Sequence, residues 1–129
     1  MTVEGSEGAG AILAIDHLQL AMPPGGEATA RAFYAGVLGL PERAKPADLA
    51  ARGGCWFERG AVRVHLGVES GFRPARKAHP AFRVTDLDAL LARCRAAGAA
   101  VGAIEARDEG RRSYVDDPFG NRIELVEIV

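Results

Sequence analysis

The sequence contains only two cysteines, Cys55 and Cys94, too few for a fold held together by a disulfide framework. It has no long apolar run, and its first residues lack the basic and then apolar order of a signal peptide. We therefore expect neither a membrane span nor a secretory signal, and a cytoplasmic location. Residues 1–10 are expected to be a disordered leader, and both cysteines are expected to be buried thiols.

The sequence also has no excess of either charge. Its 16 Lys and Arg residues stand against 17 Asp and Glu residues, a formal net charge of -1. This balance gives no general attraction to phosphate backbones or anionic lipids, so neither nucleic acid nor membrane is expected as a partner. The hydrophobic fraction of 48% is typical of a soluble globular domain, and 129 residues fit one compact domain or two half-units with a shared core.

The first half predicts a strand, a helix and a hairpin. Residues 11–20 mix β-branched and alternating residues and run into a Pro-Pro-Gly-Gly breaker, which predicts a strand followed by a turn. The apolar spacing over residues 27–38 predicts a helix that ends at Gly39, a residue suited to the left-handed conformation. Residues 55–58 and 62–68 have strand composition on either side of a short glycine-containing turn and predict a hairpin.

The second half repeats this order. It predicts a strand over residues 79–84 and a helix that starts with Thr85 and Asp88, a capping-box-like pair, and stops at Gly98. Strand composition then recurs at residues 101–104, 112–116 and 121–128, with a turn at 117–120.

An internal duplication explains the repeated order. Arg63-Val64-His65-Leu66 and Arg122-Ile123-Glu124-Leu125 share a polar-apolar alternation at equivalent ends of the two halves. We expect an α+β fold of two βαβββ modules, with module one at residues 11–69, a basic linker at 70–78 and module two at 79–129.

Four side chains at equivalent positions of the two modules are candidate metal ligands. Because side chains alternate faces along a strand, each of them lies opposite an apolar row: His17, His65, His79 and Glu124. If the four strands curl into one trough, three imidazoles and a carboxylate point into it, a set suited to a divalent transition metal. Polar positions on the wet face of a half-buried sheet are the alternative interpretation. All three histidines of the chain occupy equivalent positions, which favours the metal.

The same faces carry candidate substrate contacts: Gln19, Arg83, Arg112 and Arg122. Tyr114 shares a face with Arg112 and could bond a substrate oxygen, or it could simply fill the wall of the trough. Residues 72–77 hold three positive charges, and two arginines precede the final hairpin. If these segments line the trough they favour an anionic small molecule; a solvated loop is the alternative.

Four segments of the chain together resemble the vicinal oxygen chelate superfamily, the glyoxalase, bleomycin-resistance and extradiol-dioxygenase group. They are residues 15–20, 33–40, 79–84 and 117–124, and the resemblance extends over residues 11–129. It implies paired βαβββ modules that form a cupped mixed β-sheet. It also implies that His17, His79 and Glu124 hold one divalent metal per site, either Fe, Mn, Ni, Co or Zn.

The fourth ligand position of the superfamily is occupied here by His65. That position is Glu or Gln in glyoxalase I-like members, and is not a ligand in fosfomycin-modifying and dioxygenase members. His65 is therefore a candidate ligand whose presence leaves the individual activity undecided.

The resemblance implies a glyoxalase-like enzyme of the lyase, isomerase or transferase class. Such enzymes chelate two neighbouring oxygens of a small molecule and stabilise the enolate or oxyanion that develops. Glu124 or His65 is the candidate base, and Tyr114 a further catalytic candidate. A non-catalytic drug-binding protein of bleomycin-resistance type and an Fe(II) extradiol-type dioxygenase are the alternatives. Members of this size usually form homodimers, with the sites at or near the interface.

Overall fold

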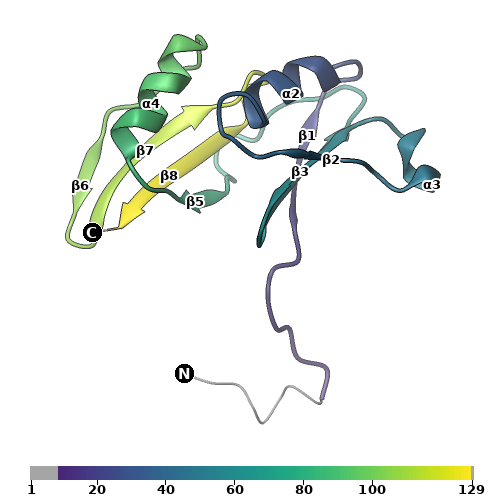
Figure 1. The fold of residues 1–129 in the computed structure, drawn as a ribbon, viewed down its shortest axis with the longest axis horizontal. Helices are drawn as coiled ribbons and strands as arrows, with labels where there is room; N and C mark the ends of the chain where they lie inside the picture. The colour runs from purple at the N-terminus through teal and green to yellow at the C-terminus, as the bar shows by residue number, and fades with distance from the viewer. Residues whose placement is uncertain (1–8, 129) are drawn as a thin grey trace.

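The computed structural model describes residues 9–128, which form two four-stranded sheets with two helices lying along one side of them (Figure 1). In chain order the elements are β1 (Leu18–Met22), α2 (Glu27–Tyr34), β2 (Glu42–Arg43), α3 (Ala47–Ala50), β3 (Cys55–Arg59), β4 (Val62–Val68), β5 (Ala81–Arg83), α4 (Leu87–Ala96), β6 (Glu105–Arg107), β7 (Gly110–Asp116) and β8 (Arg122–Ile128). Residues 1–8 of the expected leader lie outside the described residues. None of the helices described is long and apolar enough to span a bilayer.

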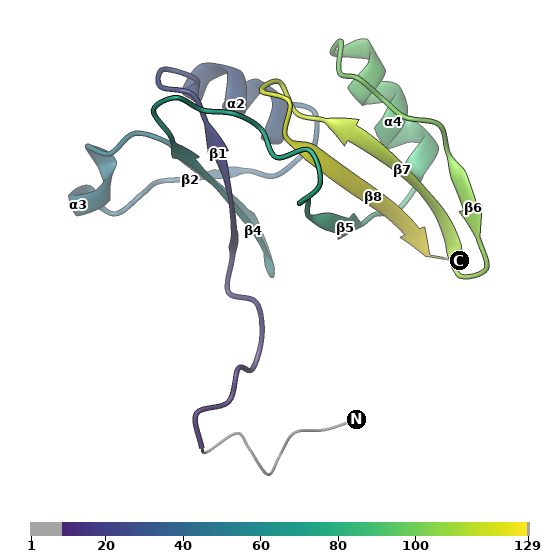
Figure 2. The same ribbon diagram turned by 180° about the vertical axis from the view of Figure 1, so that it is seen from behind.

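The two sheets have the same topology, which confirms the α+β fold of two βαβββ modules. Their strand orders are β1-β4-β3-β2 and β5-β8-β7-β6. In each sheet the first strand pairs in parallel with the last, and the other pairs are antiparallel. Figure 2 shows from behind that the two sheets stand side by side with α2 and α4 on the same side. The first strand of each module, β1 or β5, is thus an edge strand.

The apolar rows expected to pack beneath the helices do form the core. Val64 and Leu66 of β4, like Ile123 and Leu125 of β8, are at most 2% exposed. They share one hydrophobic cluster with residues of the two helices, among them Phe33, Leu87, Leu90, Leu91 and Cys94. Both cysteines are free and buried, as expected. Because the apolar rows face the helices, the alternate positions face the opposite side of each sheet.

The turn at residues 117–120 also joins the two modules. The hydroxyl of Tyr34, on α2, donates to Oδ2 of Asp117 at 2.7 Å, and the amide of Asn121 donates to the same oxygen and to the carbonyl of Ala21, on β1, at 2.8 Å each. Oδ1 of Asp117 accepts from two backbone N–H groups of the turn. Asp117 is only 4% exposed, and a buried carboxylate needs hydrogen-bond partners. Groups from both modules supply them.

The first strand is shorter than expected. Residues 11–17 lie outside the sheet and only Leu18–Met22 is a strand, so the expected start at residue 11 is wrong. In the parallel register Leu18 lies opposite Val64, and β4 begins only two residues earlier. Residues further upstream have no strand beside them, and Ile12 and Ile15 are 92% and 84% exposed.

Other boundaries also differ from the expectation. Helix α2 ends at Tyr34 and turns follow, although Gly39 has the expected positive φ of 75°. Asp86, not Thr85, caps α4, and its side chain accepts from the N–H of Ala89 at 3.2 Å. The expected strand at 101–104 is wrong, because only Val101 forms a bridge there and the strand β6 comes later. The third strand that a βαβββ module requires in module one is β2, whose residues were not identified from the sequence, and the short helix α3 was not expected.

Candidate metal centre

The four expected metal ligands form two pairs, one in each module. The rings of His17 and His65 stack with centroids 4.3 Å apart, and Nε2 of His79 lies 3.1 Å from Oε1 of Glu124. Within residues 9–128, no group of three or more His, Cys, Asp or Glu side chains is placed to hold a metal ion. A single chain therefore does not gather all four into one trough; each module presents half of the expected set.

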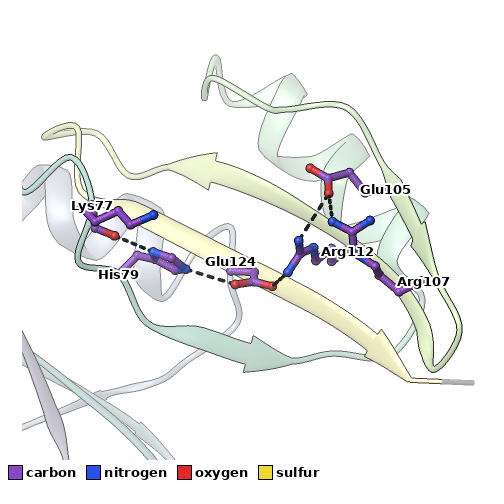
Figure 3. A network of polar contacts seen from close by, with 6 residues as sticks. All are labelled: Lys77, His79, Glu105, Arg107, Arg112 and Glu124. Atoms are coloured by element: carbon purple, nitrogen blue, oxygen red, sulfur yellow. Dashed lines mark hydrogen bonds and ion pairs between the residues drawn. The ribbon is translucent and has the colours of Figure 1, made fainter.

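The position of His79 is fixed by the strand pairing that follows it. The N–H of Glu124 donates to the carbonyl of Pro80 at 2.9 Å, and Ala81 lies opposite Glu124 in the parallel ladder. Figure 3 shows Nδ1 of His79 at the backbone carbonyl of Lys77, 2.8 Å away. A carbonyl oxygen only accepts, so Nδ1 carries a proton. In the neutral ring Nε2 then has a lone pair, and it faces a carboxylate.

The contact between His79 and Glu124 thus calls for a positive charge. A lone pair on Nε2 and a carboxylate oxygen are both acceptors, and at 3.1 Å they repel unless a proton or a metal ion lies between them. Both side chains are largely buried, at 22% and 11% exposed. A histidine whose other nitrogen donates to a backbone carbonyl is a common arrangement for a metal ligand.

Arg112 binds the other oxygen of Glu124. Its Nη1 lies 3.2 Å from Oε2, and its Nη2 lies 3.4 Å from Glu105, which also pairs with Arg107 (Figure 3). Burial raises the pKa of Glu124, but the hydrogen bonds from His79 and Arg112 outweigh it and hold the pKa below its usual value. The carboxylate is therefore ionised at neutral pH. The Nε of Arg112 is buried and has no partner among the described residues.

His17 repeats the arrangement of His79 in module one. Its Nδ1 lies 2.9 Å from Oδ2 of Asp16, and the hydrogen bond from His17 holds the pKa of Asp16 below its usual value, helped by Arg63. An ionised carboxylate accepts, so Nδ1 carries the proton and Nε2 is the nitrogen free to bind a metal. The side chain of His17 is 41% exposed.

His65 lies deeper and has different partners. Its ring lies between the rings of His17 and Trp56, the latter 4.2 Å away and inclined by 6°. Its Nε2 lies 2.9 Å from Glu58, whose pKa is lowered chiefly by this hydrogen bond. Trp56 and Glu58 were not identified from the sequence. Trp56 could have been found from the predicted hairpin, because the position of the turn places residue 56 opposite residue 65. The structure has this register.

The remaining candidates fall into two groups. Tyr114 lies beside His79, with ring centroids 5.3 Å apart at an interplanar angle of 80°, and the guanidinium of Arg122 lies 4.0 Å above the tyrosine ring. Tyr114 therefore lies beside one member of the pair in module two and Arg112 beside the other, whereas Arg122 contacts the tyrosine. Gln19 lies on β1 against Gly67, next to His65 in the parallel ladder, whereas Arg83 is exposed on β5.

A family model described as a glyoxalase-like domain matches residues 24–126. The match includes His65, His79 and Glu124, whereas His17 lies just before it. A crystal structure of a glyoxalase family protein from Bacillus anthracis is 46% identical, with a TM-score of 0.85 over 93% of this chain and 98% of that one. No functionally curated protein matches the sequence.

Two more distant structures share the fold. A lactoylglutathione lyase from Agrobacterium tumefaciens is 24% identical, with a TM-score of 0.66 over 88% of this chain and 92% of that one. An antibiotic binding protein from Streptomyces is also 24% identical, with a TM-score of 0.68 over 92% of this chain and 100% of that one. Identities this low show a common fold and leave the activity open.

Proposed function

Because the chain belongs to the glyoxalase-like domain family, within the vicinal oxygen chelate superfamily, we propose that it is a glyoxalase-like metal-dependent enzyme. Its substrate would be a small oxygenated molecule and its reaction of the lyase, isomerase or transferase class. The similarity to a lactoylglutathione lyase, although it extends only to the fold, is in line with the lyase class.

The observation that carries this proposal is the pair formed by His79 and Glu124. Nε2 of His79 and Oε1 of Glu124 lie 3.1 Å apart, a contact that needs a proton or a metal ion between them, and the carbonyl of Lys77 holds the ring while Arg112 holds the carboxylate. Two histidine Nε2 atoms and a carboxylate oxygen suit Fe, Mn, Ni, Co or Zn. His17, with Nδ1 engaged by Asp16, supplies the second such nitrogen from module one.

We propose that the site is completed in a homodimer. His17 directly precedes β1 and His79 precedes β5, and both strands lie at the edge of their sheets. If β1 of one copy faces β5 of another, His17 of the first lies beside His79 and Glu124 of the second. Two-fold symmetry then gives two equivalent sites at the interface.

A divalent metal held there would supply a Lewis acid for two neighbouring substrate oxygens. The chain itself offers two proton acceptors, Glu124 and His65, the latter oriented by the Glu58 carboxylate at its Nε2. Nε of Arg112 is buried without a partner among the described residues, and Tyr114 lies beside His79, which supports proposing both as contacts for a substrate oxygen. Arg122 holds the tyrosine ring from above.

Metal analysis of protein purified without chelator tests the proposal. We expect about one transition metal ion per chain, and a large loss of bound metal in His79→Ala and Glu124→Ala because each removes a ligand while the fold remains. Glu109→Ala, which alters an exposed glutamate of the same module, is the matched control and should bind metal normally. Unchanged metal content in both ligand variants would disprove the proposal.

A second candidate function is non-catalytic binding of a small molecule such as an antibiotic. Two observations favour it: the fold is shared with an antibiotic binding protein, and the described part of one chain forms no complete metal site. Metal-free protein that still binds a small molecule would select this function, whereas iron with ring-cleaving activity would select the dioxygenase alternative.

A further inference from the structure

We propose that His65 is a positioning residue: together with Trp56 and Glu58 it forms a rigid support that holds the ring of His17 in place for metal binding. The expected fourth ligand would then act through His17 and not by contact with the metal. This inference rests on the proposed metal site and assigns a different role to one of its residues.

The support is a column of three stacked rings. Trp56 and His65 lie directly opposite each other on β3 and β4, and their rings are nearly parallel, at 4.2 Å and 6°. The ring of His17 covers the other face of His65, at 4.3 Å and 20°. The side chain of His65 is 8% exposed, so the middle ring of the column is enclosed.

The same geometry disfavours His65 as a ligand. A histidine binds a metal through a lone pair in the plane of its ring, at about 2.0–2.1 Å. Two rings stacked face to face and inclined by only 20° confine their in-plane lone pairs to two nearly parallel planes, so the two rings cannot both point a lone pair at one ion. In addition, Nε2 of His65 is already engaged by the carboxylate of Glu58, which pins the ring within its plane.

His17 needs such a support because the backbone holds it weakly. It lies just before β1, outside the ladder, and its side chain is 41% exposed. Among residues 9–128 its side chain makes one hydrogen bond, to Asp16, which is itself 76% exposed. Without the stack, metal binding would have to immobilise the ring of His17, and that entropy loss would weaken the affinity.

Paired substitutions at His65 separate a support from a ligand. In His65→Phe the flat ring remains and the nitrogens are lost, so metal affinity should stay close to that of the wild type. In His65→Ala the stack is lost, and the affinity should fall by about 10–100-fold, the usual effect of removing a residue that orients a ligand. The affinity is measured by competition with a chromophoric chelator, using Co(II) and the full-length protein.

A second readout and a second pair keep the test decisive. The Co(II) absorption spectrum of His65→Phe should match that of the wild type, because the ligand set is unchanged. If His65→Phe does not fold, Trp56→Phe against Trp56→Ala tests the stack, since Trp56 is no ligand in any interpretation, and the Co(II) spectrum of His65→Ala shows whether a ligand has been lost.

Each outcome has a clear meaning. An equal loss of affinity in His65→Phe and His65→Ala, with an altered Co(II) spectrum, would make His65 a ligand and overturn the inference. Wild-type affinity in His65→Ala would also overturn it, since no support would be needed. If His79→Ala and Glu124→Ala keep their metal, the proposed function itself fails, a result distinct from either of these.

Discussion

At the scale of single residues, the first histidine of each module makes the same kind of hydrogen bond through Nδ1. Nδ1 of His17 is engaged by Asp16 and Nδ1 of His79 by the carbonyl of Lys77, two oxygens close by in the sequence. Both contacts fix the proton on Nδ1 and leave Nε2 for a metal. The duplicated pattern seen in the sequence thus extends to the hydrogen bonds behind the proposed ligands.

Tyr34 gives a prediction at this scale. Burial, and then the nearby Asp117 carboxylate, raise the pKa of Tyr34 well above its usual value, so the hydroxyl stays protonated and donates to Asp117. Tyr34→Phe removes a buried hydrogen bond to a charged acceptor and should lower the free energy of unfolding by about 1.5–3 kcal/mol. Tyr114→Phe is the control and should change it by less than about 0.5 kcal/mol. Urea denaturation measures both; equal values would refute a special role for Tyr34.

The sequence could identify candidate ligands but not their supports. Strand alternation was enough to single out His65 and Glu124, because it depends only on local geometry. Arg112 was selected as a substrate contact, and its bond to Glu124 depends on a pairing between β7 and β8 that alternation alone does not specify. Glu58 was missed because a charged residue near the end of a hairpin strand looks like ordinary surface.

At the scale of elements, the predicted bounds were right where contiguous residues determine them. They were wrong where a strand's end depends on a pairing partner far away in the sequence. The hairpin of β3 and β4 was expected correctly because its turn and both flanks are contiguous. The start of β1 was not predicted correctly, since it depends on where β4 begins, about 45 residues later. Parallel strands are not joined by a short turn, so the nearby sequence does not reveal their register.

Helix α4 allows a prediction about pH. Asp88, in its first turn, binds Arg111 of β7 at 2.8 Å, and this hydrogen bond lowers the pKa of Asp88. A carboxyl with a lowered folded-state pKa stabilises the fold above its unfolded pKa and loses that contribution as the pH falls through the folded value. Asp88→Asn should therefore be less stable than the wild type at neutral pH, and the difference should shrink below about pH 4.

Urea denaturation at several pH values checks this expectation, because urea does not screen charge. Asp108→Asn alters an exposed aspartate before β7 that forms no ion pair among the described residues, and it should match the wild type throughout. A difference for Asp88→Asn that stays constant down to pH 3 would contradict an electrostatic origin.

At the scale of the whole molecule, the duplication is visible in the sequence but the way the modules meet is not. His17 and His79 carry the same local pattern whether two modules of one chain close on each other or modules of two chains pair. The structure shows two separate sheets, each with its first strand at an edge and half of the proposed ligands beside it. We propose pairing between chains because it would complete the set without moving the junction at Asp117.

Mixing two variants that each lack a proposed ligand tests that arrangement. His17→Ala and Glu124→Ala each lose a proposed ligand, but from different modules. In a mixed dimer with shared sites, one site lacks both ligands, whereas the other combines His17 of one chain with Glu124 of the other and is intact. Metal binding should therefore reappear on mixing, measured as bound metal per dimer after subunit exchange has been demonstrated.

A second mixture supplies the control that makes the result specific. His79→Ala and Glu124→Ala both alter module two, so each site of their mixed dimer still lacks one ligand, and no metal binding should return. Sites contained within one chain remain broken in both mixtures, because every subunit carries its own defect. Recovery in the first mixture alone can arise only if module one of one chain and module two of the other hold the same metal ion. Absence of recovery in the first mixture would place the complete site within a single chain.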